Sequence, residues 1–140
     1  MGQEKTILLV EDSDRDAELI TLALSEIDVP VVVERSRDGD GALEFVANRG
    51  CSARDISLVL LDIKLPGMSG LEVLNRLKSD ERTGGIPVVM LTSSRERRDI
   101  RDAYRMGVNA YVVKPMEFED LLNALKCVAH FWCVVNERSY

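Results

Sequence analysis

Three carboxylates stand directly after two short apolar runs, and they have the clearest potential for chemistry in this sequence. Glu11 and Asp12 follow the run Ile7–Val10, and Asp62 follows the run Leu58–Leu61. Carboxylates that lie close together repel one another, so their ionised forms need a cation. Hard oxygen ligands of this kind suit Mg²⁺, which is held by few protein carboxylates and keeps several waters. The pattern predicts a Mg²⁺ site if the fold brings the two runs side by side.

Hydroxyl and ammonium groups end two later apolar runs. Thr92 and Ser93 follow the fourth run, and Lys114 follows the fifth, Ala110–Val113. A lysine is a point charge for phosphate, and a hydroxyl can hydrogen-bond a phosphoryl oxygen. We therefore expect Thr92, Ser93 and Lys114 to bind a phosphoryl group.

A carboxylate can serve as the nucleophile for such a group and form an aspartyl-phosphate. Asp62 begins a loop that runs to Gly70, and we expect it to be presented singly on an exposed turn, whereas Glu11 and Asp12 are adjacent. We assign Asp62 as the acceptor and the other two to the metal, with Asp12 as a direct ligand and Glu11 acting through water.

These residues must be positioned by a repeating pattern of elements. Apolar, β-rich runs alternate with amphipathic stretches of helical period, which is typical of a parallel sheet covered on both faces. The five expected strands are Ile7–Val10, Val31–Arg35, Leu58–Leu61, Pro87–Leu91 and Ala110–Val113. We predict an α/β fold, a flavodoxin-like doubly wound five-stranded parallel sheet of order 2-1-3-4-5. Ligands in such sheets bind at the carboxyl ends of the strands, here between the first and third.

The stretches between the strands carry helix signals. Ser13 or Asp14 offers a cap for the first helix, and Gly50 and Gly107 stop the second and fourth. The fifth helix begins at Phe118, is the longest, and is expected to extend to about residue 135. We expect residues 1–140 to form one domain with its core at about residues 6–126.

Four segments resemble the signatures of the response-regulator receiver family, the chemotaxis-regulator fold: VEDSDRDAE, LVLLDIKLPGMSG, VVMLTSS and VNAYVVKPM. They occur in the family's order and at its spacing. The resemblance implies that Asp62 is the phosphoacceptor, and that Asp12, Asp62 and the backbone carbonyl of Lys64 hold Mg²⁺ while Glu11 completes the acidic pair.

The same resemblance implies a switch. Thr92 and Lys114 contact the phosphoryl group, and the ring of Tyr111 moves inward as Thr92 is drawn to it. Lys114–Pro115 matches a position where the family holds a cis peptide. Lys64 and Ser94 stand where the family tunes the lifetime of the phosphoryl group.

By this resemblance a sensor histidine kinase donates the phosphoryl group, and the changed face around helix four, strand five and helix five alters partner binding. The protein would be a self-phosphorylating and self-dephosphorylating switch rather than a turnover enzyme, with an unknown downstream target. The Phe131–Trp132 ending, the extended last helix and the region 48–55 resemble stand-alone receivers that partner bacterial phytochrome histidine kinases. Apolar Phe131, Val134 and Val135 lie beyond the core stripe, and we expect them to form a homodimer interface.

Composition excludes several classes of protein. The formal net charge of -6 argues against the basic surface that nucleic acid binding requires. Three cysteines are too few for a secreted disulfide framework, so we expect a reducing cytoplasm. The sequence has no signal peptide pattern and no apolar run near the ~18 residues that span a bilayer, so we expect it to be neither exported nor bound in a membrane.

Other interpretations of these residues remain. A phosphatase of the haloacid-dehalogenase class also uses an aspartyl-phosphate, but it normally has a second acid two residues later, where this chain has Lys64. A phosphate-independent interaction module is the third hypothesis. The arginines between residues 95 and 105 interleave with acids, which favours a solvated helix face with local ion pairs. Cys127, His130 and Cys133 drift around a helix and do not favour a zinc site.

Overall fold

The computed structural model describes residues 4–138, in which five strands alternate with five α-helices. The strands are β1 (Lys5–Val10), β2 (Val31–Ser36), β3 (Ile56–Leu61), β4 (Val88–Thr92) and β5 (Ala110–Val113). The helices are α1 (Asp14–Ser25), α2 (Gly39–Asn48), α3 (Gly70–Ser79), α4 (Arg97–Arg105) and α5 (Phe118–His130). In this part of the chain, each helix is too short or too polar to span a bilayer.

All neighbouring strands pair in parallel, and their order is β2-β1-β3-β4-β5, so the predicted doubly wound sheet is confirmed. Every residue of the central strand β3 is buried. The edge strand β2 instead alternates between half-buried and exposed positions. This difference follows from position, because central parallel strands are covered on both faces and edge strands are not.

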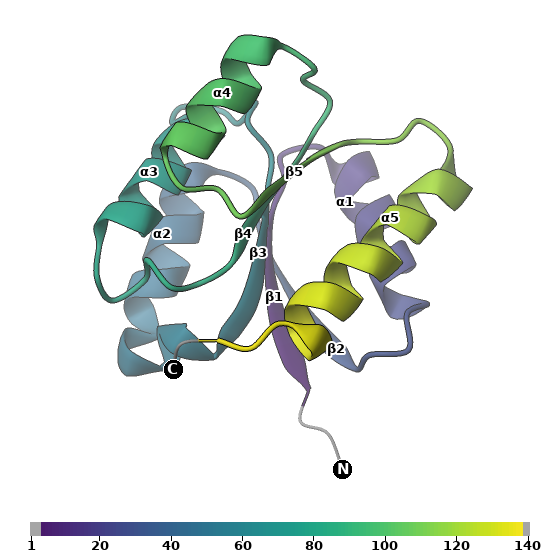
Figure 1. Ribbon diagram of the computed structural model, residues 1–140, viewed down its shortest axis with the longest axis horizontal. Helices are drawn as coiled ribbons and strands as arrows, with labels where there is room; N and C mark the ends of the chain where they lie inside the picture. Colours follow the sequence, from purple (N-terminus) through teal and green to yellow (C-terminus); the bar gives the residue numbers. More distant parts are fainter. Residues whose placement is uncertain (1–3, 139–140) are drawn as a thin grey trace.

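Two hydrophobic layers lie on opposite faces of the sheet. Figure 1 shows α1 and α5 on one face and α2, α3 and α4 on the other. Alternate residues of β1 divide between the two layers: Ile7 and Leu9 pack with α1 and α5, and Leu8 and Val10 pack with the other helices. The period of two along the strand therefore fixes which side chains face which helices.

Two glycines predicted as helix stops adopt positive φ angles. Gly50 (φ 55°) opens the 3₁₀ helix Gly50–Asp55, and Gly107 (φ 95°) follows α4. Side chains with a Cβ rarely adopt this conformation, so glycine suits both positions. Helix α1 begins after the Ser13 cap, whose side chain accepts a hydrogen bond from the backbone N–H of Asp16.

The predicted extension of the last helix is present, but its type changes. After α5 the chain continues as a π-helix, Phe131–Val135. The tail then crosses below the sheet toward α2 in Figure 1. There the Arg138 guanidinium donates a 2.7 Å hydrogen bond to the carbonyl of Ile56, at the start of β3.

Candidate functional site

The predicted site residues gather at the carboxyl end of the sheet. Val10 and Leu61 are partners in the β1–β3 ladder, and the Asp62 N–H donates to the Val10 carbonyl at 3.1 Å. Glu11 and Asp62 directly follow these two strands, so this register brings them to the same edge of the sheet. Lys114 directly follows β5, and its N–H donates to the Thr92 carbonyl at 2.7 Å. The strand-end rule therefore placed these groups correctly.

The Lys114 ammonium connects three carboxylates. Its Nζ lies 2.7 Å from Glu11 Oε1, 2.9 Å from Asp16 Oδ2 and 3.1 Å from Asp62 Oδ2. Burial lowers the pKa of Lys114, but the hydrogen bonds to Glu11 and Asp16 and the charge of Asp62 raise it above its ordinary value. The side chain is therefore a fixed positive charge at neutral pH.

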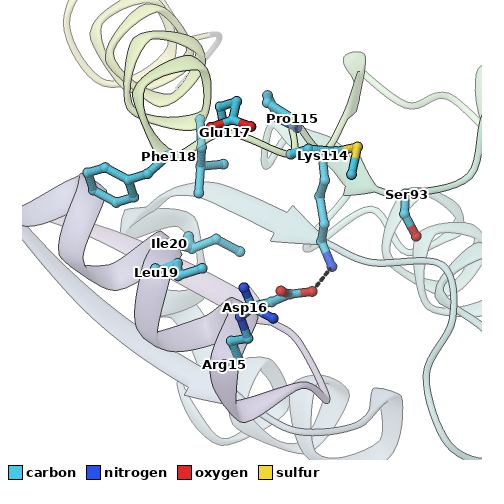
Figure 2. Close-up of a pocket in the computed structure, with 11 residues that line it drawn as sticks. Arg15, Asp16, Leu19, Ile20, Ser93, Lys114, Pro115, Glu117 and Phe118 are labelled. Atoms are coloured by element: carbon cyan, nitrogen blue, oxygen red, sulfur yellow. Dashed lines mark hydrogen bonds and ion pairs between the residues drawn. The ribbon is translucent and has the colours of Figure 1, made fainter.

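Asp16 also belongs to this cluster and was not predicted from the sequence. It lies in the first turn of α1, where an acidic residue is ordinarily explained by the helix dipole. Figure 2 shows Lys114 reaching from the end of β5 to the Asp16 carboxylate. The partners are 98 residues apart in the chain, so no local pattern indicates the pair.

Asp62 is not on an exposed turn, and that expectation is wrong. Only 7% of the residue is exposed. The Gly70 N–H donates to the Ile63 carbonyl at 2.8 Å, which closes the loop at the start of α3. The Lys64 N–H lies 3.4 Å from Asp62 Oδ1, and the Lys114 ammonium lies 3.1 Å from Asp62 Oδ2, so each carboxylate oxygen has a partner.

The two neighbouring acids differ in environment. Glu11 is 2% exposed, and this burial raises its pKa, while hydrogen bonds from Lys114 and the Ser13 N–H partly offset the shift. Asp12 is exposed at the start of the loop to α1. Glu11 is thus committed to Lys114, and the Asp12 carboxylate is open to solvent.

Thr92 and Tyr111 are joined through the backbone of Ser94. Thr92 is fully buried, and its Oγ1 accepts a 3.4 Å contact from the Ser94 N–H. The Tyr111 hydroxyl donates to the Ser94 carbonyl at 3.0 Å, and burial raises the pKa of this phenol. The Ser94 hydroxyl in turn donates to Asp99 of α4 at 2.6 Å. Ser93, the other predicted hydroxyl, is exposed.

The peptide bond between Lys114 and Pro115 is trans, so the expectation of a cis bond is wrong. A trans bond needs no special support, because it is favoured by about 0.5–1 kcal/mol before proline. Beside it lies a groove of about 270 Å³ between α1 and the loop from β5 to α5 (Figure 2). Its walls include Arg15, Asp16, Ser93, Lys114 and Phe118.

The donor set suits a divalent cation. When ionised, the three carboxylates around Lys114 leave two negative charges uncompensated, and Asp12 adds another beside them. In residues 4–138 no three His, Cys, Asp or Glu side chains are grouped as metal ligands. Mg²⁺ needs fewer, because one or two carboxylates and water commonly hold it. The oxygens of Asp12, Asp62 and the Lys64 carbonyl therefore fit Mg²⁺ chemically.

The basic segment and the cysteines carry no second site. All five arginines between residues 95 and 105 are exposed, as expected. The expected local ion pairs are absent from the structure over residues 4–138, where Asp99 contacts Ser94 instead. The three cysteines are free, and only Cys133 is buried.

Comparison with known proteins identifies relatives along nearly the whole chain. The family model described as the response regulator receiver domain matches residues 7–126. The probable methanogenesis regulatory protein FilR2 of Methanothrix harundinacea is 40% identical over 127 residues, which cover 90% of this chain and 82% of FilR2. Response regulator Rcp1 of Synechocystis is 38% identical over 133 residues, covering 91% of this chain and 88% of Rcp1.

Solved structures agree with these relatives. The phosphorylated cyanobacterial phytochrome response regulator RcpA superposes with a TM-score of 0.90 at 36% identity, covering 99% of this chain and all of RcpA. The Mn²⁺-bound form of Rcp1 superposes with a TM-score of 0.85 at 33% identity, covering 97% of this chain and 99% of that one. The likeness therefore extends through the C-terminal helix.

Proposed function

The chain belongs to the response regulator receiver domain family of two-component signalling, and on this premise we propose that Asp62 accepts a phosphoryl group from a sensor histidine kinase. One observation carries the proposal: the Lys114 ammonium lies 3.1 Å from the buried Asp62 carboxylate, beside Glu11. A carboxylate fixed next to a permanent positive charge is suited to receive an anionic group.

In the proposed reaction an Asp62 carboxylate oxygen attacks phosphorus, and an oxygen–phosphorus bond forms. The phosphorus–nitrogen bond of the donor phosphohistidine breaks, and its electron pair returns to the imidazole. Lys114 offsets the charge of the phosphoryl oxygens, and the Thr92 hydroxyl and Ser93 provide hydrogen bonds to them. The burial of Asp62 limits access of water to the product.

Mg²⁺ is the proposed cofactor, with Asp12, Asp62 and the Lys64 carbonyl as ligands and Glu11 acting through water. When bound, the ion would neutralise charge that develops on the phosphoryl oxygens. The Mn²⁺-bound form of the relative Rcp1 supports a divalent cation. The protein's own residues set the site: the Lys114 ammonium contacts both the Glu11 and the Asp62 carboxylates.

The proposed switch uses the connection through Ser94. A phosphoryl group on Asp62 would draw the Thr92 hydroxyl away from the Ser94 N–H, a long contact of 3.4 Å. The Ser94 carbonyl anchors the Tyr111 hydroxyl, and its side chain anchors α4 through Asp99. Movement of this one loop would therefore change the face formed by α4, β5 and α5, and the protein would act as a switch rather than a turnover enzyme.

The proposed phosphorylation should require Mg²⁺ and a small phosphodonor, and should proceed without a kinase. With acetyl phosphate and Mg²⁺, the protein is expected to gain one phosphoryl group by intact mass spectrometry. With acetyl phosphate and EDTA, it should gain none, because the uncompensated carboxylates repel an anionic donor. Equal phosphorylation in both samples would contradict the metal site, and steady release of phosphate from generic phosphomonoesters would favour a phosphatase instead.

A phytochrome-type histidine kinase is the proposed upstream partner. RcpA is a cyanobacterial phytochrome response regulator, and its structure matches this chain to the end of the C-terminal helix. A cytoplasmic location is proposed with it, supported by three free cysteines. We propose no binding to nucleic acid, because the formal net charge is -6.

We also propose a homodimer through the C-terminal π-helix. Phe131, Val134 and Val135 are 45%, 53% and 52% exposed, whereas Cys133 of the same π-helix is buried. Such an apolar strip favours association.

Val134→Asp is expected to weaken this dimer by about tenfold or more, because a charge buried in an apolar interface costs more than about 1.4 kcal/mol. Sedimentation velocity over a concentration series measures the effect. Leu22→Asp is the matched control, since Leu22 of α1 is an apolar residue of similar exposure, 49%, outside the strip. Equal weakening by both variants would argue against the proposed interface.

A further inference from the structure

One arginine binds the backbone of the loop ahead of α1, residues 11–13, which carries Glu11 and Asp12. Arg35, near the end of β2, uses all three nitrogens of its guanidinium. Its Nε and Nη2 donate to the Glu11 carbonyl at 3.1 Å and 2.9 Å, and Nη2 also donates to the Asp12 carbonyl at 3.2 Å. Its Nη1 pairs with Asp14 Oδ1 at 2.9 Å. These contacts join β2, the loop and the first residue of α1.

The loop needs such support for an electrostatic reason. Glu11 and Asp12 are adjacent carboxylates, and Glu11 lies in the same cluster as Asp16 and Asp62. Their mutual repulsion favours an opened loop whenever no cation is bound. Arg35 supplies a positive charge and two carbonyl anchors without occupying any carboxylate of the pair.

A guanidinium is required for this arrangement. Its planar fork presents several donors in fixed directions, whereas a lysine is a single point charge on a flexible stem. The Arg35 side chain is 24% exposed, which indicates a packed position rather than a solvated one. Its partner Asp14 is 70% exposed, so the ion pair alone would contribute little. The hydrogen bonds to the Glu11 and Asp12 carbonyls therefore distinguish Arg35 from an ordinary surface ion pair.

We propose that Arg35 is a positioning residue for the divalent cation: it fixes the backbone of Glu11 and Asp12 and thereby sets how tightly the acidic pair holds metal. The proposal rests on the metal site of the proposed function and adds a residue that touches neither metal nor phosphoryl group. Supporting contacts behind metal ligands commonly change affinity by about 10–100-fold.

Mn²⁺ titration of the full-length protein, followed by the electron paramagnetic resonance signal of the free ion, tests the proposal. Arg35→Ala and Arg35→Lys are both expected to raise the Mn²⁺ dissociation constant by about tenfold. Arg37→Ala is the matched control. Arg37 pairs with the same Asp14 oxygen at 2.6 Å but is 63% exposed and has no bond to the loop carbonyls. It should leave the dissociation constant unchanged.

Two further measurements distinguish an unfolded variant, a wrong role for Arg35 and a wrong metal site. Circular dichroism without metal checks that each variant is folded, and Arg35→Lys provides the test if Arg35→Ala does not fold. If Arg35→Lys and Arg37→Ala bind Mn²⁺ as the unaltered protein does, the inference is overturned while the metal site stands. If the unaltered protein and Asp12→Asn bind Mn²⁺ equally weakly, the metal site itself is wrong and the inference falls with it.

Discussion

Asp62→Asn protein is expected to take up no phosphoryl group from acetyl phosphate and Mg²⁺ under conditions that phosphorylate the unaltered protein completely. The amide has nearly the same shape, and its oxygen can still accept from the Lys64 N–H. It lacks the negative charge that attacks phosphorus and that pairs with Lys114 at 3.1 Å. Intact mass spectrometry and peptide mapping of the phosphorylated residue measure the effect.

Asp16→Asn is the matched control for this experiment. Asp16 also pairs with the Lys114 ammonium, at 2.9 Å, so the control removes one carboxylate from the same lysine and leaves Asp62 in place. It should still take up one phosphoryl group. Incorporation into Asp62→Asn, or mapping of the group to another residue of the unaltered protein, would refute the assignment of Asp62.

The positions of the five strands could be predicted because each strand contains a short apolar run rich in Val, Ile and Leu between turn residues. The first residues of β2 and β5 were predicted correctly, but those of β1 and β3 were not. Lys5 and Thr6 belong to β1, and Ile56 and Ser57 belong to β3, although the polar residues Lys5, Thr6 and Ser57 are typical of loops. They are in strands because neighbouring backbones offer hydrogen bonds, as when the Lys5 N–H donates to the Pro30 carbonyl at 3.0 Å.

The strand-end residues of the site could be predicted for a similar reason. Parallel strands place their carboxyl ends at one edge, so Glu11, Asp62 and Lys114 meet whatever the details of the loops. Asp16 and Arg35 depend instead on how far a long side chain reaches across elements, which neither spacing nor composition encodes. The burial of Asp62 likewise depends on the path of the loop that follows it.

A substitution at the end of that loop is expected to destabilise the protein strongly. Gly70 begins α3, and a Cβ at this position would lie 1.9 Å from the Asp62 carbonyl oxygen and 2.8 Å from the Ile63 Cα. Both are backbone atoms, so a rotamer change cannot relieve the clash. Gly70→Ala is expected to lower the free energy of unfolding by about 3 kcal/mol or more, at the upper end of overpacking. Urea denaturation measures this loss.

Gly39→Ala separates this clash from the general effect of alanine at a helix start. Gly39 is likewise the first residue of a helix, α2, but its added Cβ would meet a side-chain atom, Val73 Cγ2, at 2.6 Å. That methyl group can shift, so the expected loss is about 1 kcal/mol. Equal losses of unfolding free energy in the two variants would mean that the backbone around Gly70 can shift to accommodate the added Cβ. A larger loss for Gly70→Ala, together with slower phosphorylation of its folded fraction, would mean that the close approach of α3 to the Asp62 backbone holds the acceptor in place.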